Sequence, residues 1–120
     1  MRPPRRDGRS RQPREPAMSG AFAVIVAFDL LAGRRGAFLA LALENAAASV
    51  GLEAGCLRFD VLEPEGSESI MLYEIYTDPA AFDAHLRSAH FQSFDDATRH
   101  LVARKTVTVC DAAVHRKADA

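Results

Sequence analysis

The sequence predicts an α+β fold of the ferredoxin-like type, in which the elements follow the order β-α-β-β-α-β. Three observations support this prediction: a length of 120 residues, a hydrophobic content of 48%, and the order of strand-like and helix-like patterns along the chain. The length suits one domain with a hydrophobic core and is too short for two. The longest apolar stretch, residues 21–31, contains Asp29 and is too short for a membrane span, so no membrane partner is expected.

The first strand and the first helix are predicted in the first half of the chain. Residues 21–29 (AFAVIVAFD) are β-rich and almost wholly apolar, which is typical of a central strand covered on both faces. Residues 37–52 show helical spacing, with Asn45 on the apolar side. Gly51 lies in the last turn and Gly55 just beyond it, and either could end the helix.

A hairpin is predicted next. Residues 56–62 (CLRFDVL) alternate strictly, with Leu57, Phe59 and Val61 expected together on one face, which predicts a strand with a polar face. Residues 64–67 (PEGS) have the composition of a turn. Residues 70–77 are therefore expected to be the partner strand.

The second helical region is predicted to begin at Asp78, the N-cap, followed by Pro79 in the first turn. His85 falls on the inner face of this helix, among apolar neighbours. A further helical pattern follows over residues 91–102, and residues 104–111 (RKTVTVCD) are predicted to form the last strand.

This order of elements has two consequences for the arrangement of the sheet. The second and fourth strands are opposite edges in the ferredoxin-like topology, so Cys56 and Cys110 are expected to be too far apart for a disulfide. The helices cover only one face of the four-stranded sheet. Apolar residues on the other face predict a partner, most simply a second copy of the chain.

Charge is distributed unevenly along the chain. The total of 15 basic and 16 acidic residues gives no electrostatic reason to expect a nucleic-acid partner. Residues 1–17 contain six arginines and few apolar side chains, so a disordered basic leader is predicted there. The domain is predicted over residues 18–112, and residues 113–120 are expected to be a flexible tail. A cytoplasmic location is expected, because no secretory signal is recognisable and only two cysteines are present.

Polar side chains at positions that the pattern places on inner faces are the candidates for chemistry: Asn45, Arg58, Glu74, Tyr76, His85 and His90. No zinc-binding motif, P-loop or nucleophile elbow is present in the sequence. Asn45 could simply hydrogen-bond a backbone group. His85 could be a core histidine, but an imidazole is also the side chain best suited to act as a general base near neutral pH.

The other candidates also have structural explanations. His90 could be a histidine that caps the end of a helix, where its charge suits the helix dipole. Glu74 and Tyr76 could be an exposed pair at a sheet edge, or a carboxylate and a phenol that open into a pocket. Arg58 could form a cross-strand ion pair. Their common placement around one interface between helix and sheet favours a pocket.

Several of these positions lie in motifs that resemble a known family. Asn45, residues 55–61 (GCLRFDV), residues 73–76 (YEIY), residues 81–86 (AFDAHL) and residues 90–91 (HF) resemble the antibiotic biosynthesis monooxygenase (ABM) family over residues 21–111. Within that family, the sequence also resembles the branch that contains quinol monooxygenases and the phospho-autoinducer-2 isomerase. The resemblance implies a dimeric α+β barrel, a pocket between sheet and helices, and oxidation of quinols or phenols by O2 without a metal or another cofactor.

The resulting hypothesis is a monooxygenase that uses no cofactor and acts on a small quinol, phenolic or enolisable substrate. His85 is the proposed base, and Asn45 and Tyr76 are expected to hydrogen-bond the developing oxyanion. The expected substrate-binding residues are Arg58, Glu74, His90 and Phe91. Two alternatives remain: an isomerase of a small hydroxy-diketone that forms the same carbanion, and a dimer that binds a small molecule without turnover.

Overall fold

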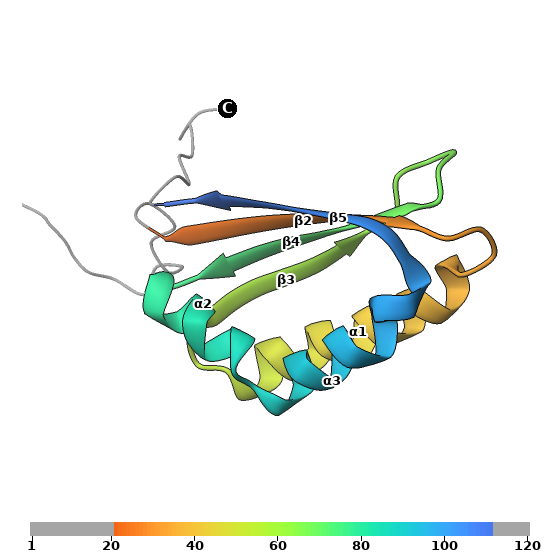
Figure 1. Ribbon diagram of the computed structural model, residues 1–120. Helices are drawn as coiled ribbons and strands as arrows, with labels where there is room; N and C mark the ends of the chain where they lie inside the picture. Colours follow the sequence, from red (N-terminus) through yellow and green to blue (C-terminus); the bar gives the residue numbers. More distant parts are fainter. Residues whose placement is uncertain (1–20, 112–120) are drawn as a thin grey trace, which may run out of the picture.

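One antiparallel sheet with helices packed on one of its faces makes up residues 21–111, the part of the chain that the computed structural model describes (Figure 1). The predicted leader (residues 1–17) and tail (residues 113–120) lie outside the described residues. The elements in chain order are β2 (Phe22–Leu30), α1 (Arg35–Leu52), β3 (Cys56–Leu62), β4 (Ser69–Tyr76), α2 (Pro79–Leu86), α3 (Ala89–Thr98), the 3₁₀ turn η1 (Arg99–Leu101) and β5 (Val102–Cys110). This order confirms the predicted β-α-β-β-α-β arrangement.

The strand order in the sheet is β3-β4-β2-β5, which is the ferredoxin-like topology that the sequence predicted. The apolar strand β2 is central and pairs with β4 on one side and β5 on the other. The strands β3 and β5 are the opposite edges. Cys56 and Cys110 lie on these two edges and are both free thiols, as expected.

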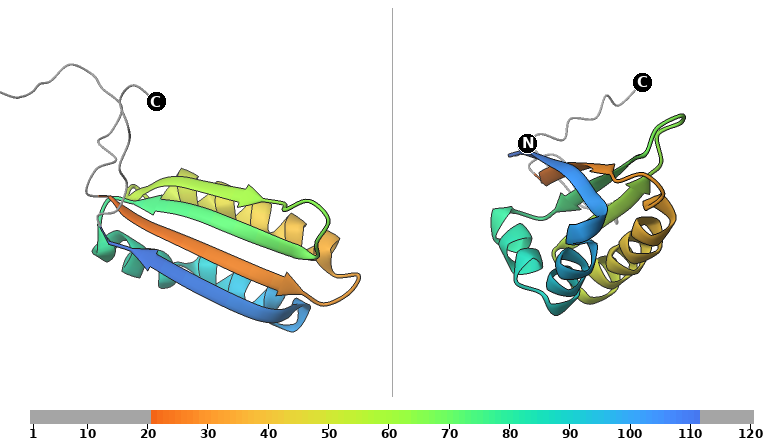
Figure 2. Two further views of the ribbon diagram at one scale, coloured as in Figure 1. Left: turned by 90° about the horizontal axis from the view of Figure 1, so that it is seen from above. Right: turned by 45° about the vertical axis from the view of Figure 1, so that its right-hand side comes forward.

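The hydrophobic core lies between β2 and the helices. Side chains that alternate along β2, including Val24 and Phe28, are buried on the helix side. Phe28 contacts Phe38 of α1 with ring centroids 4.7 Å apart, and Phe94 of α3 contacts Phe38 at 5.6 Å. These contacts fix α1 and α3 against the same face, and within residues 21–111 the other face of the sheet carries no helix (Figure 2).

The strand β3 has the predicted bounds but not the predicted faces. Its pairing with β4 shifts between Cys56 and Arg58, as in a β-bulge. The extra residue turns Cys56 and Phe59 toward the core, whereas Leu57 packs on the open face with Tyr73. The expectation that Leu57 and Phe59 share a face is therefore wrong, because strict alternation assumes regular pairing.

The two short helices are separated by a sharp turn. Asp78 caps α2 as predicted, accepting a hydrogen bond from the backbone N–H of Ala81 at 2.8 Å. Ser88 caps α3 in the same way by accepting from Phe91. His90 therefore lies in the first turn of α3 and does not cap the end of a helix, which corrects that interpretation. Among residues 21–111, no helix is long and apolar enough to span a membrane.

Candidate functional site

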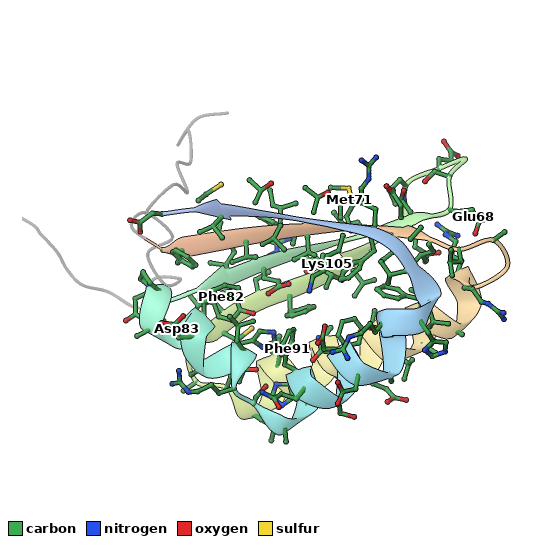
Figure 3. The ribbon with its side chains drawn as sticks, viewed as in Figure 1. Glu68, Met71, Phe82, Asp83, Phe91 and Lys105 are labelled. Atoms are coloured by element: carbon green, nitrogen blue, oxygen red, sulfur yellow. The ribbon has the colours of Figure 1, made fainter. Side chains whose placement is uncertain are left out.

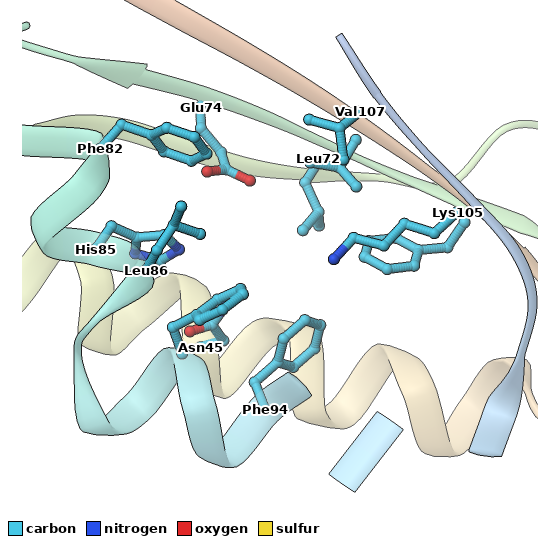
Figure 4. Close-up of a pocket in the computed structure, with 12 residues that line it drawn as sticks. Asn45, Leu72, Glu74, Phe82, His85, Leu86, Phe94, Lys105 and Val107 are labelled. Carbon is cyan, nitrogen blue, oxygen red and sulfur yellow. The ribbon is translucent and has the colours of Figure 1, made fainter. Parts of the chain in front are cut away.

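A small cavity lies between the covered face of the sheet and the three helices (Figure 4). Its volume is about 50 Å³, enough for a few water molecules and well below the roughly 300 Å³ of a typical small-molecule site. The cavity is lined by Val26, Phe28, Asn45, Leu72, Glu74, Phe82, His85, Leu86, Phe91, Phe94, Lys105 and Val107. The exposed members, Leu86, Lys105 and Val107, form its rim, so a larger ligand enters by displacing side chains there.

His85 is held at the inner end of this cavity by α2. The side chain is 2% exposed and is surrounded by the rings of Tyr76 at 5.5 Å and Phe91 at 5.1 Å. Its Nδ1 lies 2.8 Å from Oε2 of Glu53, and a neutral imidazole fits this contact when Nδ1–H donates. Burial lowers the pKa of His85, and the contact with Glu53 opposes this effect only in part. At neutral pH the ring is therefore uncharged, with Nε2 as its basic nitrogen.

Glu53 joins two histidines. Its Oε2 accepts from His85 and also from Nε2 of His90, whose side chain is partly exposed. Its Oε1 is buried without a hydrogen-bond partner among the described residues. Sequence analysis missed Glu53, although a carboxylate just after the last turn of a helix is unfavourable for the helix dipole and so signals another purpose.

Gly55 makes this contact sterically feasible. A Cβ atom at position 55 would lie 2.5 Å from Cβ of Ala81 in the first turns of α2. Because real Cβ atoms do not approach so closely, only glycine lets α2 lie against the turn between α1 and β3. This close packing brings His85 to Glu53.

Glu74 and Tyr76 form a second buried pair on β4. The Tyr76 hydroxyl donates to Oε1 of Glu74 at 2.5 Å, and both side chains are buried. Burial raises the pKa of the Glu74 carboxyl to about 7, although the hydrogen bond from Tyr76 opposes the shift. Burial and the neighbouring Glu74 raise the pKa of Tyr76, so the phenol stays protonated. Glu74 lines the cavity, and Tyr76 lies behind it.

Asn45 lies on the floor of the cavity, on α1. Its side chain is buried, and the carbonyl oxygen Oδ1 has no hydrogen-bond partner among residues 21–111. A buried amide oxygen without a partner costs about 1–3 kcal/mol. The explanation offered above, a bond from the side chain to the backbone, does not account for this oxygen, which is left available to a ligand or a water molecule.

The charged residue at the cavity is not the one that the sequence predicted. Arg58 lies on the open face of the sheet, where it pairs with Asp60 at 2.7 Å and stacks over Tyr73, so it does not reach the cavity. Lys105, which the sequence analysis did not single out, lines the cavity instead. The signal was available in the alternation of Lys105 with Val107 on the last strand, opposite the apolar side of β2.

Glu53, His85 and His90 are also the residues that could hold a metal ion. Their donor atoms all lie within 4.8 Å of one another, and two imidazoles with one carboxylate suit a divalent transition metal. Two histidine N–H groups that donate to one carboxylate account for the same contacts without an ion. The arrangement can thus fix the tautomers of both imidazoles by hydrogen bonding alone.

Comparison with known proteins identifies relatives of this chain. The sequence model of the antibiotic biosynthesis monooxygenase family matches residues 21–97. No curated protein matches the chain. Among solved structures, Rv0793 from Mycobacterium tuberculosis is similar at 28% identity, with a TM-score of 0.73 over 82% of this chain and 98% of that one.

Two further structures show the same fold at lower identity. A candidate antibiotic biosynthesis monooxygenase from Nitrosomonas europaea is 23% identical, with a TM-score of 0.74 over 78% of this chain and 90% of that one. PA3566 from Pseudomonas aeruginosa is 23% identical, with a TM-score of 0.72 over 79% of this chain and 96% of that one.

Proposed function

The chain belongs to the antibiotic biosynthesis monooxygenase family, and from that premise we propose that it oxidises a small quinol, phenolic or enolisable substrate with O2 and without a cofactor. The observation that carries this proposal is the position of His85. It is a neutral imidazole, oriented by Glu53, at the inner end of an otherwise largely apolar cavity. This combination is what a general base near neutral pH requires.

The first proposed step is removal of a proton. Nε2 of His85 takes it from an acidic O–H or C–H of the substrate, and the substrate becomes a phenolate or enolate. Glu53 stabilises the imidazolium that forms, because its carboxylate accepts from Nδ1–H. Asn45 is proposed to hydrogen-bond the substrate. His90 is proposed to help hold Glu53 in place beside the base, and the ring of Phe91 to pack against the imidazole of His85.

The second proposed step uses O2 as the oxidant. The electron-rich carbon of the anion bonds to O2, and protonation gives a hydroperoxide on that carbon. Loss of water breaks the O–O bond and leaves a carbonyl, so a substrate RH2 and O2 give R=O and H2O. Glu74, which lines the cavity and has a pKa of about 7, is proposed to donate a proton to the departing oxygen. Tyr76 orients Glu74, and Arg58 has no part in this proposal.

The test is oxygen consumption by the purified protein. It would be incubated with a panel of quinols and hydroxyaromatic compounds, and O2 uptake would be compared with autoxidation in buffer. With ¹⁸O2, the expected result is one labelled oxygen atom in the product carbonyl. If O2 uptake stays at the background rate for the whole panel, the monooxygenase proposal is wrong.

The alternatives give different results in the same experiment. An isomerase would return the proton to a neighbouring carbon, so NMR in D2O would show deuterium exchange into the compound without O2 uptake. A protein that only binds its ligand would show neither exchange nor uptake.

We also propose that the protein is a homodimer that pairs through the open face of the sheet. Apolar side chains that are half-buried or exposed gather on that face, over which no helix lies within residues 21–111: Ile25, Leu57, Leu62, Met71 and Tyr73. Covering such a surface with a second copy removes it from water.

A further inference from the structure

A cation stands at the rim of the cavity, on the side opposite His85. Lys105 pairs with Phe28 across β2 and β5 and faces the helices. Its Nζ lies 5.7 Å from the ring centroid of Phe28 and 5.9 Å from that of Phe91. Figure 4 shows the ammonium directed into the space between sheet and helices, with His85 on the other side, and Figure 3 shows Phe91 and Lys105 on the same side of the sheet.

The charge of this ammonium is only weakly compensated. The carboxylate closest to it in an ion pair is Asp95, at 3.9 Å, and Asp95 is bound more closely by Arg99 at 2.7 Å. Glu74 faces the same cavity, but with a pKa of about 7 it is roughly half protonated at neutral pH. Lys105 therefore places a positive charge at the rim of a mostly apolar cavity.

We propose that Lys105 binds a carbonyl oxygen of the substrate that becomes ionised when the reacting C–H loses its proton, and that the substrate is a planar conjugated molecule with this oxygen at one end and the C–H at the other. The inference rests on the proposed function and adds the substrate class. Phe28 and Phe91 flank the ammonium, and aromatic rings of the cavity wall suit a flat ligand.

The placement of base and cation at opposite sides explains how they act together. His85 removes the proton from the C–H, the C–H electron pair moves through the conjugated system, and the negative charge collects on the oxygen beside Lys105. No oxidant is needed for this step, since it is a proton transfer. Positive charge placed where negative charge develops stabilises the transition state of such a step.

The test uses p-nitrophenol, whose phenolate absorbs visible light whereas the phenol does not. The apparent pKa of the bound probe is read directly from the spectrum. An ammonium close to the oxygen is expected to lower this pKa by about one unit relative to free probe, which corresponds to roughly tenfold tighter binding of the phenolate. In Lys105→Met the shift should disappear, while binding of the neutral isostere p-nitrotoluene should be unchanged.

Control variants distinguish the effect of the Lys105 charge on the probe's pKa from the effect of the protein's overall charge. Arg104→Met removes the same charge from the neighbouring residue, which is exposed on the open face and pairs with Asp29, and it should leave the probe's pKa unchanged. Lys105→Arg should retain most of the shift. Repeating the titration in Glu74→Gln removes the contribution of that carboxyl, and melting curves verify that each variant is folded.

Three results would overturn the inference: no binding of either probe to the wild type, a bound pKa equal to that of free probe, or a shift that survives Lys105→Met. If the pKa shift depends on Lys105 but no compound of the panel gives O2 uptake, the anion site is supported and the monooxygenase proposal is wrong. The two proposals therefore fail separately.

Discussion

Polar side chains on the two faces of the sheet differ in how completely they are paired. On the open face, charged side chains are paired with one another: Arg58 binds Asp60 at 2.7 Å, and Arg104 binds Asp29 at 3.4 Å. On the covered face, polar side chains are buried and incompletely paired. Oδ1 of Asn45 has no partner among the described residues, nor has Oε1 of Glu53 at the end of α1.

This difference indicates where function lies. Polar groups at an exposed surface form pairs at little cost and contribute little to stability. Buried polar groups that lack partners cost free energy, so their presence needs an explanation other than stability. This contrast supports the proposals that the covered face carries the chemistry and that the open face contacts a second copy. Substitutions on each face test this division.

Replacing His85 should have the largest effect on turnover. His85→Gln keeps one hydrogen bond but cannot take a proton near pH 7, so turnover of a substrate found in the oxygen-uptake panel should fall by about 100-fold or more. His100→Gln is the matched control, since His100 is exposed on η1 and lies outside the cavity lining. Full activity in His85→Gln would remove His85 from the mechanism.

Glu74→Gln should stabilise the protein at high pH by about 3 kcal/mol. The pKa of the Glu74 carboxyl is raised from 4.5 to about 7, so the folded state holds this proton more tightly than the unfolded chain. The contribution of this group to stability is therefore lost as the pH rises from about 4.5 to about 7.

Urea unfolding of the wild type and Glu74→Gln at pH 4.5 and pH 8 measures this effect. The difference between the two proteins should be small at pH 4.5 and full at pH 8. Titration of His85 affects both proteins alike and largely cancels. A difference that is the same at both pH values would show that the substitution acts through packing instead.

Thr108→Asp should weaken the proposed dimer. Thr108 is exposed on β5 and pairs with Ile25, so it lies on the open face. In a symmetric interface the carboxylate enters twice, and we expect at least about tenfold weaker association. Sedimentation over a range of concentrations measures it, with Gln92→Asp on the exposed side of α3 as control. Equal masses for both variants would contradict the placement of the interface.

Chelation should have the smallest effect. If hydrogen bonds alone hold Glu53, His85 and His90 together, neither EDTA nor added Zn²⁺ should change the melting temperature. A clear rise with Zn²⁺ that is lost in His90→Gln would instead show that these residues bind a metal.

Most of the fold was predictable because it depends on local periodicity. The apolar run in β2 and the Asp78 cap of α2 are encoded in adjacent residues, and each lies where the sequence placed it. The faces of β3 were not predictable, because the bulge at Leu57 is set by pairing with β4 and leaves no mark in the alternation of the strand itself. The break before α3 likewise depends on Ser88, a cap that the pattern of apolar residues does not show.

The site was predictable only in part. Asn45, Glu74 and His85 were found because each is a polar residue on an apolar face, and the structure brings all three to one cavity. Glu53 was missed because its importance comes from a contact with His85, 32 residues away in the chain. Arg58 was expected at the pocket because it lies in a motif shared with the family, but it lies on the face opposite Phe59, as the alternation of the strand implies, and so does not reach the cavity.

The strand that carries Lys105 has a further consequence for motion. In β5 every residue except the first and the last is exposed, and the strand is bonded to the described sheet only through β2. Its pairing joins Ala23 to Cys110, so it forms by closing a loop of almost the whole domain, which is a slow event in folding. A strand that is hydrogen-bonded on one side only opens more readily than a central strand, and we expect the amides of β5 to exchange with solvent faster than those of β2. Two of the side chains at the rim of the cavity, Lys105 and Val107, are carried by this strand, so the motion of its edge would also set how easily a ligand reaches the buried imidazole.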